Sequence, residues 1–282
     1  MRTDEEVAEA AQLACLLEVS APKPGNVSPG HHFHDTRYED FLASAVAIRP
    51  AFAAAGERPL GATIRAAVEA TARRTRSNTN LGIVLLLAPL ARAARRAGGP
   101  LRQRLAGVLA ETTVADAGEV YTAIRQARPG GLGEAAAEDV TAIPTVTLRD
   151  AMALAAERDT VAREYATDFE VTFQTGVPAL ERARQDGLSW SEATVEVFLA
   201  LLADVPDTHI ARKLGPGAAA AVSHRAQEVQ RAGGVRSAAG IRALAELDRE
   251  LRDPRNTRNP GTTADLTCAS LFVVILERGW ER

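Results

Sequence analysis

Residue types that can bind phosphate or accept a proton gather in five short stretches of this alanine-rich chain. The first stretch, residues 21–35, places Lys23 as a point charge on a loop braced by prolines. His34 and Asp35 end this stretch just before a helical pattern begins. A metal site of the His-Asp phosphohydrolase type needs a much more distant histidine, so we disfavour it. A solvated turn is an equally good interpretation of the other two histidines.

The scarcity of lysine and asparagine draws attention to these stretches. Of 33 basic residues only Lys23 and Lys213 are lysines. In such a composition a surviving lysine or asparagine is one that arginine or aspartate could not replace, although chance survival explains any single case. These residues cluster in a few short stretches, which favours function. The asparagines are Asn26, Asn78, Asn80, Asn256 and Asn259.

The second and third stretches combine small polar residues and glycine. Residues 77–82 (SNTNLG) open an apolar helical pattern, and a helix cap accounts for one of Ser77, Asn78, Thr79 and Asn80. Amides and hydroxyls lining a helix start also form a phosphate site, which accounts for the whole cluster. The third stretch, PGGLGEA, places Glu134 after glycine-rich backbone and is equally typical of a turn.

The fourth stretch, residues 207–217, supplies one carboxylate and two cations. Asp207, Arg212 and Lys213 lie within about two turns if this segment is helical. A surface helix with ion pairs is the alternative, but the scarce lysine and His209 favour a functional site. The segment GPGAAA imitates a dinucleotide fingerprint, which we reject because no strand pattern precedes it.

The fifth stretch, residues 259–272, opens the last long helical pattern. Thr262 or Thr263 is expected to cap this helix, which would place Asp265 in the first turn beside free backbone amides. The helix dipole alone would stabilise a carboxylate there without any ligand. Together with Gly261, the cluster is better explained as a phosphate and metal site.

The rest of the chain indicates a single all-α domain, residues 1–282, of about a dozen helices. Apolar residues recur at helical spacing, and Gly, Pro or capping residues separate most patterns. Only residues 141–148 have the β-branched content of a strand. The helical patterns run over 4–19, 38–54, 60–76, 79–97, 101–112, 114–127, 149–166, 168–185, 190–203, 217–231, 236–252 and 262–278.

Composition excludes several classes of partner. A net charge of -3 lacks the basic field of proteins that bind nucleic acid or membrane surfaces. The longest apolar run, residues 82–91, is about half a membrane span. Cys15 and Cys268 lie in apolar helical patterns and are expected to be buried thiols, as in a reducing cytoplasm. The start of the chain does not resemble a signal peptide.

In their order and spacing, the five stretches resemble the triphosphoribosyl-dephospho-CoA synthase family. The resemblance spans almost the whole chain, with two departures: Asn80-Leu81 stands where the family commonly has His-Lys, and Leu132 stands where it has Arg. The matching residues are Pro22-Lys23-Pro24-Gly25, His34-Asp35, Asn78-Thr79 with Gly82, Gly133-Glu134-Ala135, Asp207-Thr208 with Arg212 and Gly215, and Pro260-Gly261 with Ala264-Asp265-Leu266.

The resemblance implies an all-α fold and transfer of the triphosphoribosyl unit of ATP, with adenine as the leaving group. The acceptor would be the 2′-hydroxyl of 3′-dephospho-CoA, for synthesis of a prosthetic-group precursor. A divergent relative could use another alcohol, such as a pterin cofactor precursor. The expected partners are therefore small molecules in the cytoplasm, and a homodimer is compatible with this interpretation.

The same resemblance assigns candidate roles. Asp35, Glu134 and Asp207 are the candidate catalytic residues, and Asp207 and Asp265 are the candidate ligands of Mg²⁺. The remaining candidate residues would neutralise the charge of the triphosphate or bind it through their backbone amides. The expected nucleotide-binding residues are Lys23, Asn26, His34, Asn78, Thr79, Asn80, Arg212, Lys213, Gly261 and Thr262.

Two other classes of function remain as alternatives. A metal-dependent phosphohydrolase or glycohydrolase would use water in place of the alcohol, and would release adenine without any acceptor. A helical scaffold without activity would not bind nucleotides and would tolerate substitution of Lys23 and Asp265. Both rank behind the transferase.

Overall fold

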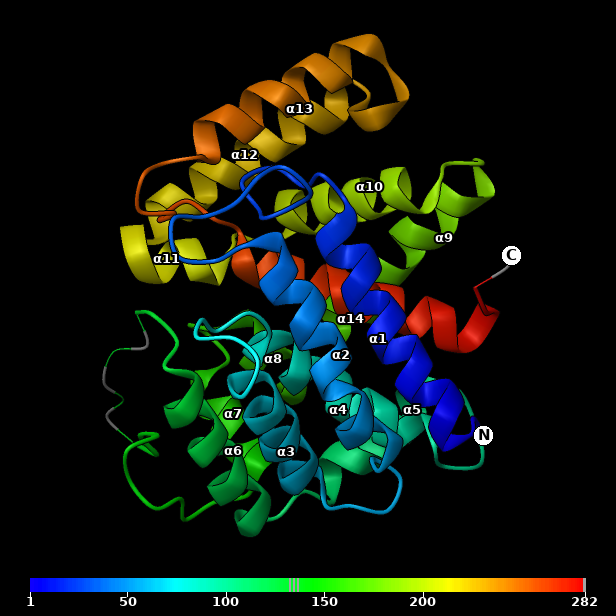
Figure 1. Ribbon diagram of the computed structural model, residues 1–282, viewed down its shortest axis with the longest axis vertical. Helices are drawn as coiled ribbons and strands as arrows, with labels where there is room; N and C mark the ends of the chain where they lie inside the picture. Colours follow the sequence, from blue (N-terminus) through cyan, green and yellow to red (C-terminus); the bar gives the residue numbers. More distant parts are fainter. Residues whose placement is uncertain (132, 134, 136, 281–282) are drawn as a thin grey trace.

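The computed structural model describes residues 1–131, 133, 135 and 137–280, and within these residues it is built from helices and loops, without a strand (Figure 1). The all-α prediction is confirmed. The fourteen α-helices of the described residues are α1 (Asp4–Ser20), α2 (Tyr38–Ala53), α3 (Leu60–Ala72), α4 (Leu81–Ala94), α5 (Leu101–Ala110), α6 (Val114–Ala127), α7 (Leu148–Ala155), α8 (Thr160–Ala166), α9 (Val177–Gln185), α10 (Trp190–Asp204), α11 (Thr208–Leu214), α12 (Pro216–Arg231), α13 (Ala238–Leu251) and α14 (Gly261–Arg278).

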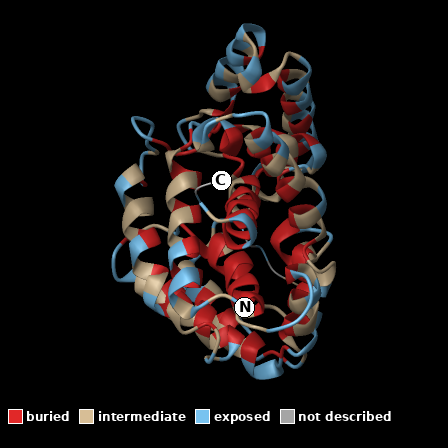
Figure 2. Cartoon of the chain, turned by 90° about the vertical axis from the view of Figure 1, so that its right-hand side faces the viewer, coloured by how far each residue is buried: buried red, intermediate tan, exposed pale blue. Residues whose placement is uncertain are grey.

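Helix α14 is the central element of the fold. Its residues from Leu266 to Leu276 are all buried, which is the pattern of a helix packed on every side. It packs against α1, α4, α9 and α10, and Figure 2 shows buried residues gathered on the interior helices. Cys268 of this helix meets Cys15 of α1, with 3.8 Å between the two sulfur atoms. Both are free, buried thiols, as the sequence predicts.

Local signals explain where several of the surrounding helices begin. Thr3, Thr113 and Ser189 each accept a hydrogen bond from the backbone N–H three residues later, and an acidic side chain at that third position bonds back to the capping residue. These capping boxes fix the starts of α1, α6 and α10. Helix α10 contributes to both hydrophobic cores, the large one around α14 and a smaller one formed with α12 and α13.

Some predicted elements differ from the observed ones. The pattern over 149–166 is two helices, because the Asp159 side chain caps α8 and interrupts the run. The pattern over 168–185 begins with a π-helical segment, Thr172–Gly176, ahead of α9. Residues 141–147 form a loop, and α11 has only seven residues and was not among the predicted helices.

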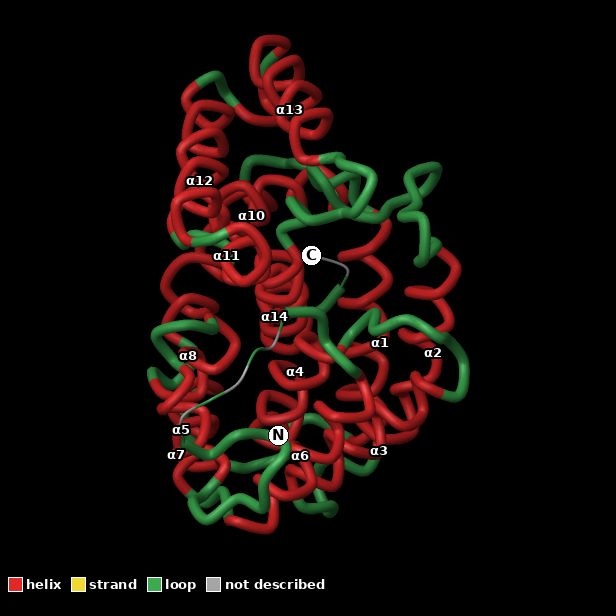
Figure 3. Tube along the Cα trace, turned by 90° about the vertical axis from the view of Figure 1, so that its left-hand side faces the viewer, coloured by secondary structure: helices red, strands yellow, loops and turns green. Residues whose placement is uncertain are grey.

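Loops from distant parts of the chain come together around the start of α14 (Figure 3). The Asn259 side-chain amide donates to the Gly25 carbonyl at 3.1 Å and to the Asn26 side chain at 3.0 Å. These bonds connect the first stretch of candidate residues to the fifth. In the described part of the chain, no helix combines the length and apolar character needed to span a membrane.

Candidate active site

A cavity of about 760 Å³ lies where α1, α4, α6, α8, α11 and α14 approach one another. Its volume is within the usual range for a small-molecule site. All five asparagines of the chain line it, together with Lys213. The scarce residue types therefore converge on one place, with Lys23 as the exception.

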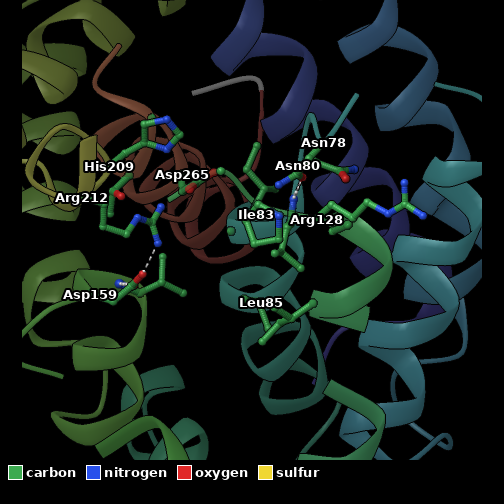
Figure 4. Close-up of a pocket in the computed structure, with 18 of the residues that line it drawn as sticks. Asn78, Asn80, Ile83, Leu85, Arg128, Asp159, His209, Arg212 and Asp265 are labelled. Atoms are coloured by element: carbon green, nitrogen blue, oxygen red, sulfur yellow. Dashed lines mark hydrogen bonds and ion pairs between the residues drawn. The ribbon is translucent and has the colours of Figure 1, made fainter. Parts of the chain in front are cut away.

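Asp265 lies at the centre of this cavity, between two groups of polar side chains (Figure 4). Its carboxylate lies against the backbone of Gly82, where a Cβ atom would be 2.0 Å from Oδ2, so the approach requires glycine. No described residue donates a hydrogen bond to it. Burial raises the pKa of Asp265 well above its usual value, and the negative charges of Glu18, Asp207 and Asp159 add to this effect.

On one side of Asp265, an ion pair joins α8 and α11 (Figure 4). Arg212 Nη1 is 2.8 Å from Asp159 Oδ2, while Asp159 Oδ1 accepts from the first amides of α8. His209 lies beside Gly261, at which a Cβ atom would be only 3.0 Å from Nδ1. Burial, with the positive charges of Lys213 and Arg212, lowers the pKa of His209 to about 3, so the imidazole is neutral.

On the other side, residues 78–80 are tied to the helices behind them. Asn78 Oδ1 accepts from the Leu81 amide at 3.1 Å and so satisfies the first amide of α4, although the N-cap position itself is Asn80, whose side chain makes no cap bond. The Thr79 hydroxyl bonds to that of Ser44 on α2 at 2.6 Å, and the Asn80 amide donates to Thr71 on α3 at 3.0 Å. All three still border the cavity.

Exposed cations surround the mouth of the cavity. Four arginines there have no side-chain hydrogen bond or ion pair to any residue that the structure describes. Lys213 joins them and uses one donor on the Asn256 carbonyl, at 3.1 Å. The four arginines are Arg76, Arg128, Arg158 and Arg255.

Most of the expected site residues border this cavity. Asp35 is exposed at its edge, and the fifth stretch contributes the start of α14. Glu134 lies outside the described residues. The expected residues that line the cavity are Asn26, Asp35, Asn78, Thr79, Asn80, Arg212, Lys213, Gly261, Thr262 and Asp265.

Lys23 and His34 are not among the lining residues. Lys23 is fully buried, and its ammonium lies 2.9 Å from Glu18 Oε1 and also donates to the Glu18 and Ala21 carbonyls. The three donors of a lysine are thereby used. His34 is exposed, 3.7 Å from Asp35 and hydrogen-bonded to Asn256. Its expected contact with nucleotide is not supported by this position.

Asp207 is buried and also lies outside the lining, contrary to the expectation of a base or metal ligand. Its Oδ1 accepts from the Ile210 amide at 3.0 Å, and its Oδ2 accepts from the amide and hydroxyl of Thr263 at 2.7 and 2.8 Å. Asp207 therefore caps two helices at once. The expectation that Thr262 or Thr263 caps the last helix is wrong, because Asp207 supplies that cap from α11.

The expected position of Asp265 also needs correction. Helix α14 starts at Gly261, so Asp265 is its fifth residue and lies beyond the first turn and its free amides. Among the described residues, no group of three histidine, cysteine or acidic side chains is arranged to hold a metal ion. A single carboxylate with substrate phosphates is nevertheless a usual arrangement for Mg²⁺, and the unpartnered Asp265 fits that description.

Sequence reasoning missed several lining residues. Glu18 and Asp159 were overlooked, although a glutamate in the last turn of a helix is an unusual choice and Asp159-Thr160 is a capping signal. The arginines at the mouth gave no signal, because they cannot be distinguished by type among so many other arginines.

Comparison with known proteins gives a consistent assignment. A sequence model of the family described as ATP:dephospho-CoA triphosphoribosyl transferase (CitG) matches residues 4–282. A probable 2-(5''-triphosphoribosyl)-3'-dephosphocoenzyme-A synthase of Pseudomonas fluorescens is 34% identical over 118 residues, which are 42% of this chain and 40% of the relative. The corresponding protein of Pseudomonas putida is 37% identical over 113 residues, 40% of each chain. These alignments thus span well under half the length of the curated relatives.

A solved structure agrees over a longer range. A crystal structure from Archaeoglobus fulgidus, assigned as a triphosphoribosyl-dephospho-CoA synthase, superposes with a TM-score of 0.67 at 28% identity. It covers 85% of this chain and 100% of its own. With the family model matching nearly every residue, the chain belongs to the ATP:dephospho-CoA triphosphoribosyl transferase family.

Proposed function

We propose that this protein transfers the triphosphoribosyl unit of ATP to the 2′-hydroxyl of 3′-dephospho-CoA and releases adenine. The family to which the chain belongs supports this proposal. The observation on which it depends most is the convergence on one cavity with an acidic centre of all five asparagines and of five cations whose side chains make at most one hydrogen bond to the described residues. Cations would bind the negatively charged triphosphate, and carboxylates would stabilise the positive charge that develops on the reacting ribose.

The cavity residues would divide the work by charge. The arginines at the mouth and Lys213 would neutralise the triphosphate, with Arg able to bind phosphate oxygens in pairs. Cleavage of the N-glycosidic bond develops positive charge on the ribose, as in glycoside hydrolysis, and Asp265 at the centre would stabilise it. Asp35 at the edge, and Glu134, remain the proposed proton acceptors for the incoming hydroxyl. Asp207 has no part in this chemistry, because both its oxygens accept from backbone amides.

Mg²⁺ is the proposed metal, and Asp265 is the carboxylate of this chain that would hold it together with phosphate oxygens. When bound, the ion would supply charge neutralisation for the triphosphate. We further propose that the protein works in the cytoplasm, where ATP and CoA precursors are found and where its two buried cysteines would stay reduced. We also propose that it assembles as a homodimer.

The direct test is to incubate the protein with ATP, Mg²⁺ and dephospho-CoA and to separate the products by chromatography and mass spectrometry. We expect adenine in equal amount to a dephospho-CoA product heavier by one triphosphoribosyl unit. ADP, AMP or pyrophosphate as the stoichiometric product would contradict the proposal. Adenine release at the same rate without acceptor would indicate a hydrolase.

A second acceptor is worth testing because of the residues at 80 and 81. Leu81 borders the cavity with an apolar side chain where the family commonly has lysine. If dephospho-CoA is not consumed but adenine appears on addition of a pterin cofactor precursor, the donor half of the proposal stands and the acceptor changes.

A further inference from the structure

Glu18 is a cavity residue whose presence local stability does not explain. It lies in the last turn of α1, where the negative end of the helix dipole disfavours a carboxylate. Its side chain is only 5% exposed, yet it lines the cavity. Burial of a charge at an unfavourable helix position is costly, so a role at the cavity is the better explanation.

Lys23 makes this burial tolerable and fixes the carboxylate in place. Its ammonium lies 2.9 Å from Glu18 Oε1 and is fully buried. The same ammonium donates to the Glu18 and Ala21 carbonyls at the end of α1, which is also where the helix dipole favours a cation. Lys23 is thus held by three acceptors around one point, and Glu18 is held by Lys23.

The ion pair determines which ligand chemistry suits Glu18. Because Lys23 pairs with Glu18, the net charge of the pair is zero, and the pair attracts a cation less than a free carboxylate would. Its second oxygen, Oε2, has no donor among the residues that the structure describes, and a carboxylate oxygen remains a strong hydrogen-bond acceptor. A neutral O–H is the matching group, and nucleotides present it as ribose hydroxyls, which carboxylates also bind in dinucleotide-binding folds.

We propose that Glu18, oriented by Lys23, accepts a hydrogen bond from a ribose hydroxyl of the nucleotide in the cavity. Glu18 is then a recognition residue for ribose, and Lys23 is a positioning residue that acts through it. The inference rests on the proposed function, because that function brings two riboses to the cavity, one in ATP and one in dephospho-CoA. The donor and the acceptor share this chemistry, so the test must separate them.

The test is equilibrium binding by calorimetry, which needs no turnover. Wild type and Glu18→Gln are each titrated with ATP, 2′-deoxy-ATP and 3′-deoxy-ATP, and then with dephospho-CoA and its analogue lacking the 2′-hydroxyl. We expect wild type to bind one hydroxylated ligand at least about tenfold more tightly than its deoxy analogue, the size of a hydrogen bond to a charged group. In Glu18→Gln this ratio should fall to within about twofold. The pair that shows the effect identifies the ribose.

Two further variants control for folding. Glu9→Gln changes an exposed glutamate of the same helix and should keep the wild-type ratio. The double variant Glu18→Gln/Lys23→Met removes both charges and leaves no unpaired buried ammonium, so it serves if the single variant does not fold. Its ratio should also fall to within about twofold. A merely structural role would weaken every ligand alike and leave the ratio unchanged.

Three results would overturn the inference. One is a wild-type protein that does not discriminate any deoxy analogue, which requires no variant at all. Another is a Glu18→Gln protein that discriminates as wild type does; the proposed function would then still stand. The third is a wild-type protein that binds neither ATP nor dephospho-CoA, which would contradict the proposed function as well.

Discussion

Two polar regions meet at the cavity, and they differ in how far the chain satisfies its own polar groups. Around the starts of α11 and α14, Asp207 accepts three hydrogen bonds within the protein, and Asn259 donates two. At the centre and the mouth, the side chains of Asp265, Arg128 and Arg158 have no hydrogen-bond or ion-pair partner among the described residues. The first region is complete without a ligand, whereas the second is not.

This difference separates support from binding. A buried carboxylate that already accepts several amide hydrogen bonds would lose them if it bound a metal or a proton, so it belongs to the scaffold. A carboxylate and cations without partners, held in a cavity, have unused bonding capacity, which is typical of sites that bind charged substrates. Asp207 and Asp265 illustrate the two cases, although both belong to motifs of the same family.

We expect the largest loss of activity from substitution of Asp265. Asp265→Asn keeps the shape of the side chain and removes its charge at the centre of the cavity. We expect adenine release to fall by at least about 100-fold, the usual cost of removing one electrostatic stabiliser of a transition state. The free energy of unfolding should stay the same or rise, because burial and neighbouring negative charges raise the pKa of this carboxyl and so disfavour its charged form in the folded protein, and no described residue bonds to it. Rates from chromatography and urea unfolding measure both quantities.

A fully active Asp265→Asn protein would remove this residue from the site. Loss of activity together with a large loss of stability would instead place Asp265 in the supporting region, and the distinction between the two regions would then fail.

Asp207 should give the opposite result. In the wild type, the two carboxylate oxygens of Asp207 accept from the backbone N–H groups of Ile210 and Thr263. In Asp207→Asn, the side-chain NH₂ must replace one of these oxygens, so one of the two backbone N–H groups loses its acceptor. We expect a loss of about 1–3 kcal/mol in the free energy of unfolding, the cost of a buried donor left without a partner. Urea unfolding at constant slope would measure it. Asp204→Asn is the matched control, in an exposed aspartate that accepts one hydrogen bond from the described residues, donated by the Thr175 hydroxyl, and it should change stability by less than about 0.5 kcal/mol.

The sequence predicted the all-α fold, and most of the residues it singled out border one cavity, whereas it did not predict what each of them bonds to. Helices are repeated local patterns, so their periodicity was sufficient, and only short or interrupted ones such as α11 were missed. The scarcity of asparagine located the cavity correctly, since all five border it. The hydrogen-bond partner of a residue depends on tertiary structure and cannot be read from local sequence. Asp207, for example, accepts from Thr263, which lies 56 positions further along the chain.

Residue type was also ambiguous in itself. Lys23 belongs to a scarce residue type, but it forms a buried ion pair with Glu18 and does not line the cavity. Conversely, the arginines at the mouth have the properties expected of phosphate-binding groups, yet a chain in which almost every cation is arginine gives no way to select Arg128 or Arg158 without coordinates.

Because His209 is largely buried and neutral in the folded protein, it should make the free energy of unfolding depend on pH. Its pKa of about 3 in the folded protein lies below the usual 6.5, because burial and the charges of Lys213 and Arg212 disfavour the imidazolium. Between these two pH values the unfolded chain binds more protons, so this histidine contributes stability above about pH 6.5 that is lost as the pH falls toward 3. We expect wild type to lose stability more steeply than His209→Asn in this window, by at most about 1.4 kcal/mol per pH unit. Identical slopes in urea unfolding at several pH values would contradict a buried neutral histidine.

The smallest expected effect concerns the open mouth itself. Arg128 and Arg158 are exposed, so solvent and salt screen their attraction for a triphosphate, and neither guanidinium bonds to a described residue. We expect Arg128→Gln and Arg158→Gln each to raise the KM for ATP about threefold, or about 0.7 kcal/mol, with kcat and stability almost unchanged. The effect should shrink as KCl is raised from low to high concentration, because screening weakens what the arginine contributes. Arg231→Gln, at the exposed end of α12 and outside the cavity, is the matched control and should leave KM unchanged at every salt concentration. If all three variants behave alike, the mouth arginines attract nucleotide no better than any surface charge, and only the centre of the cavity would distinguish the open region from the closed one.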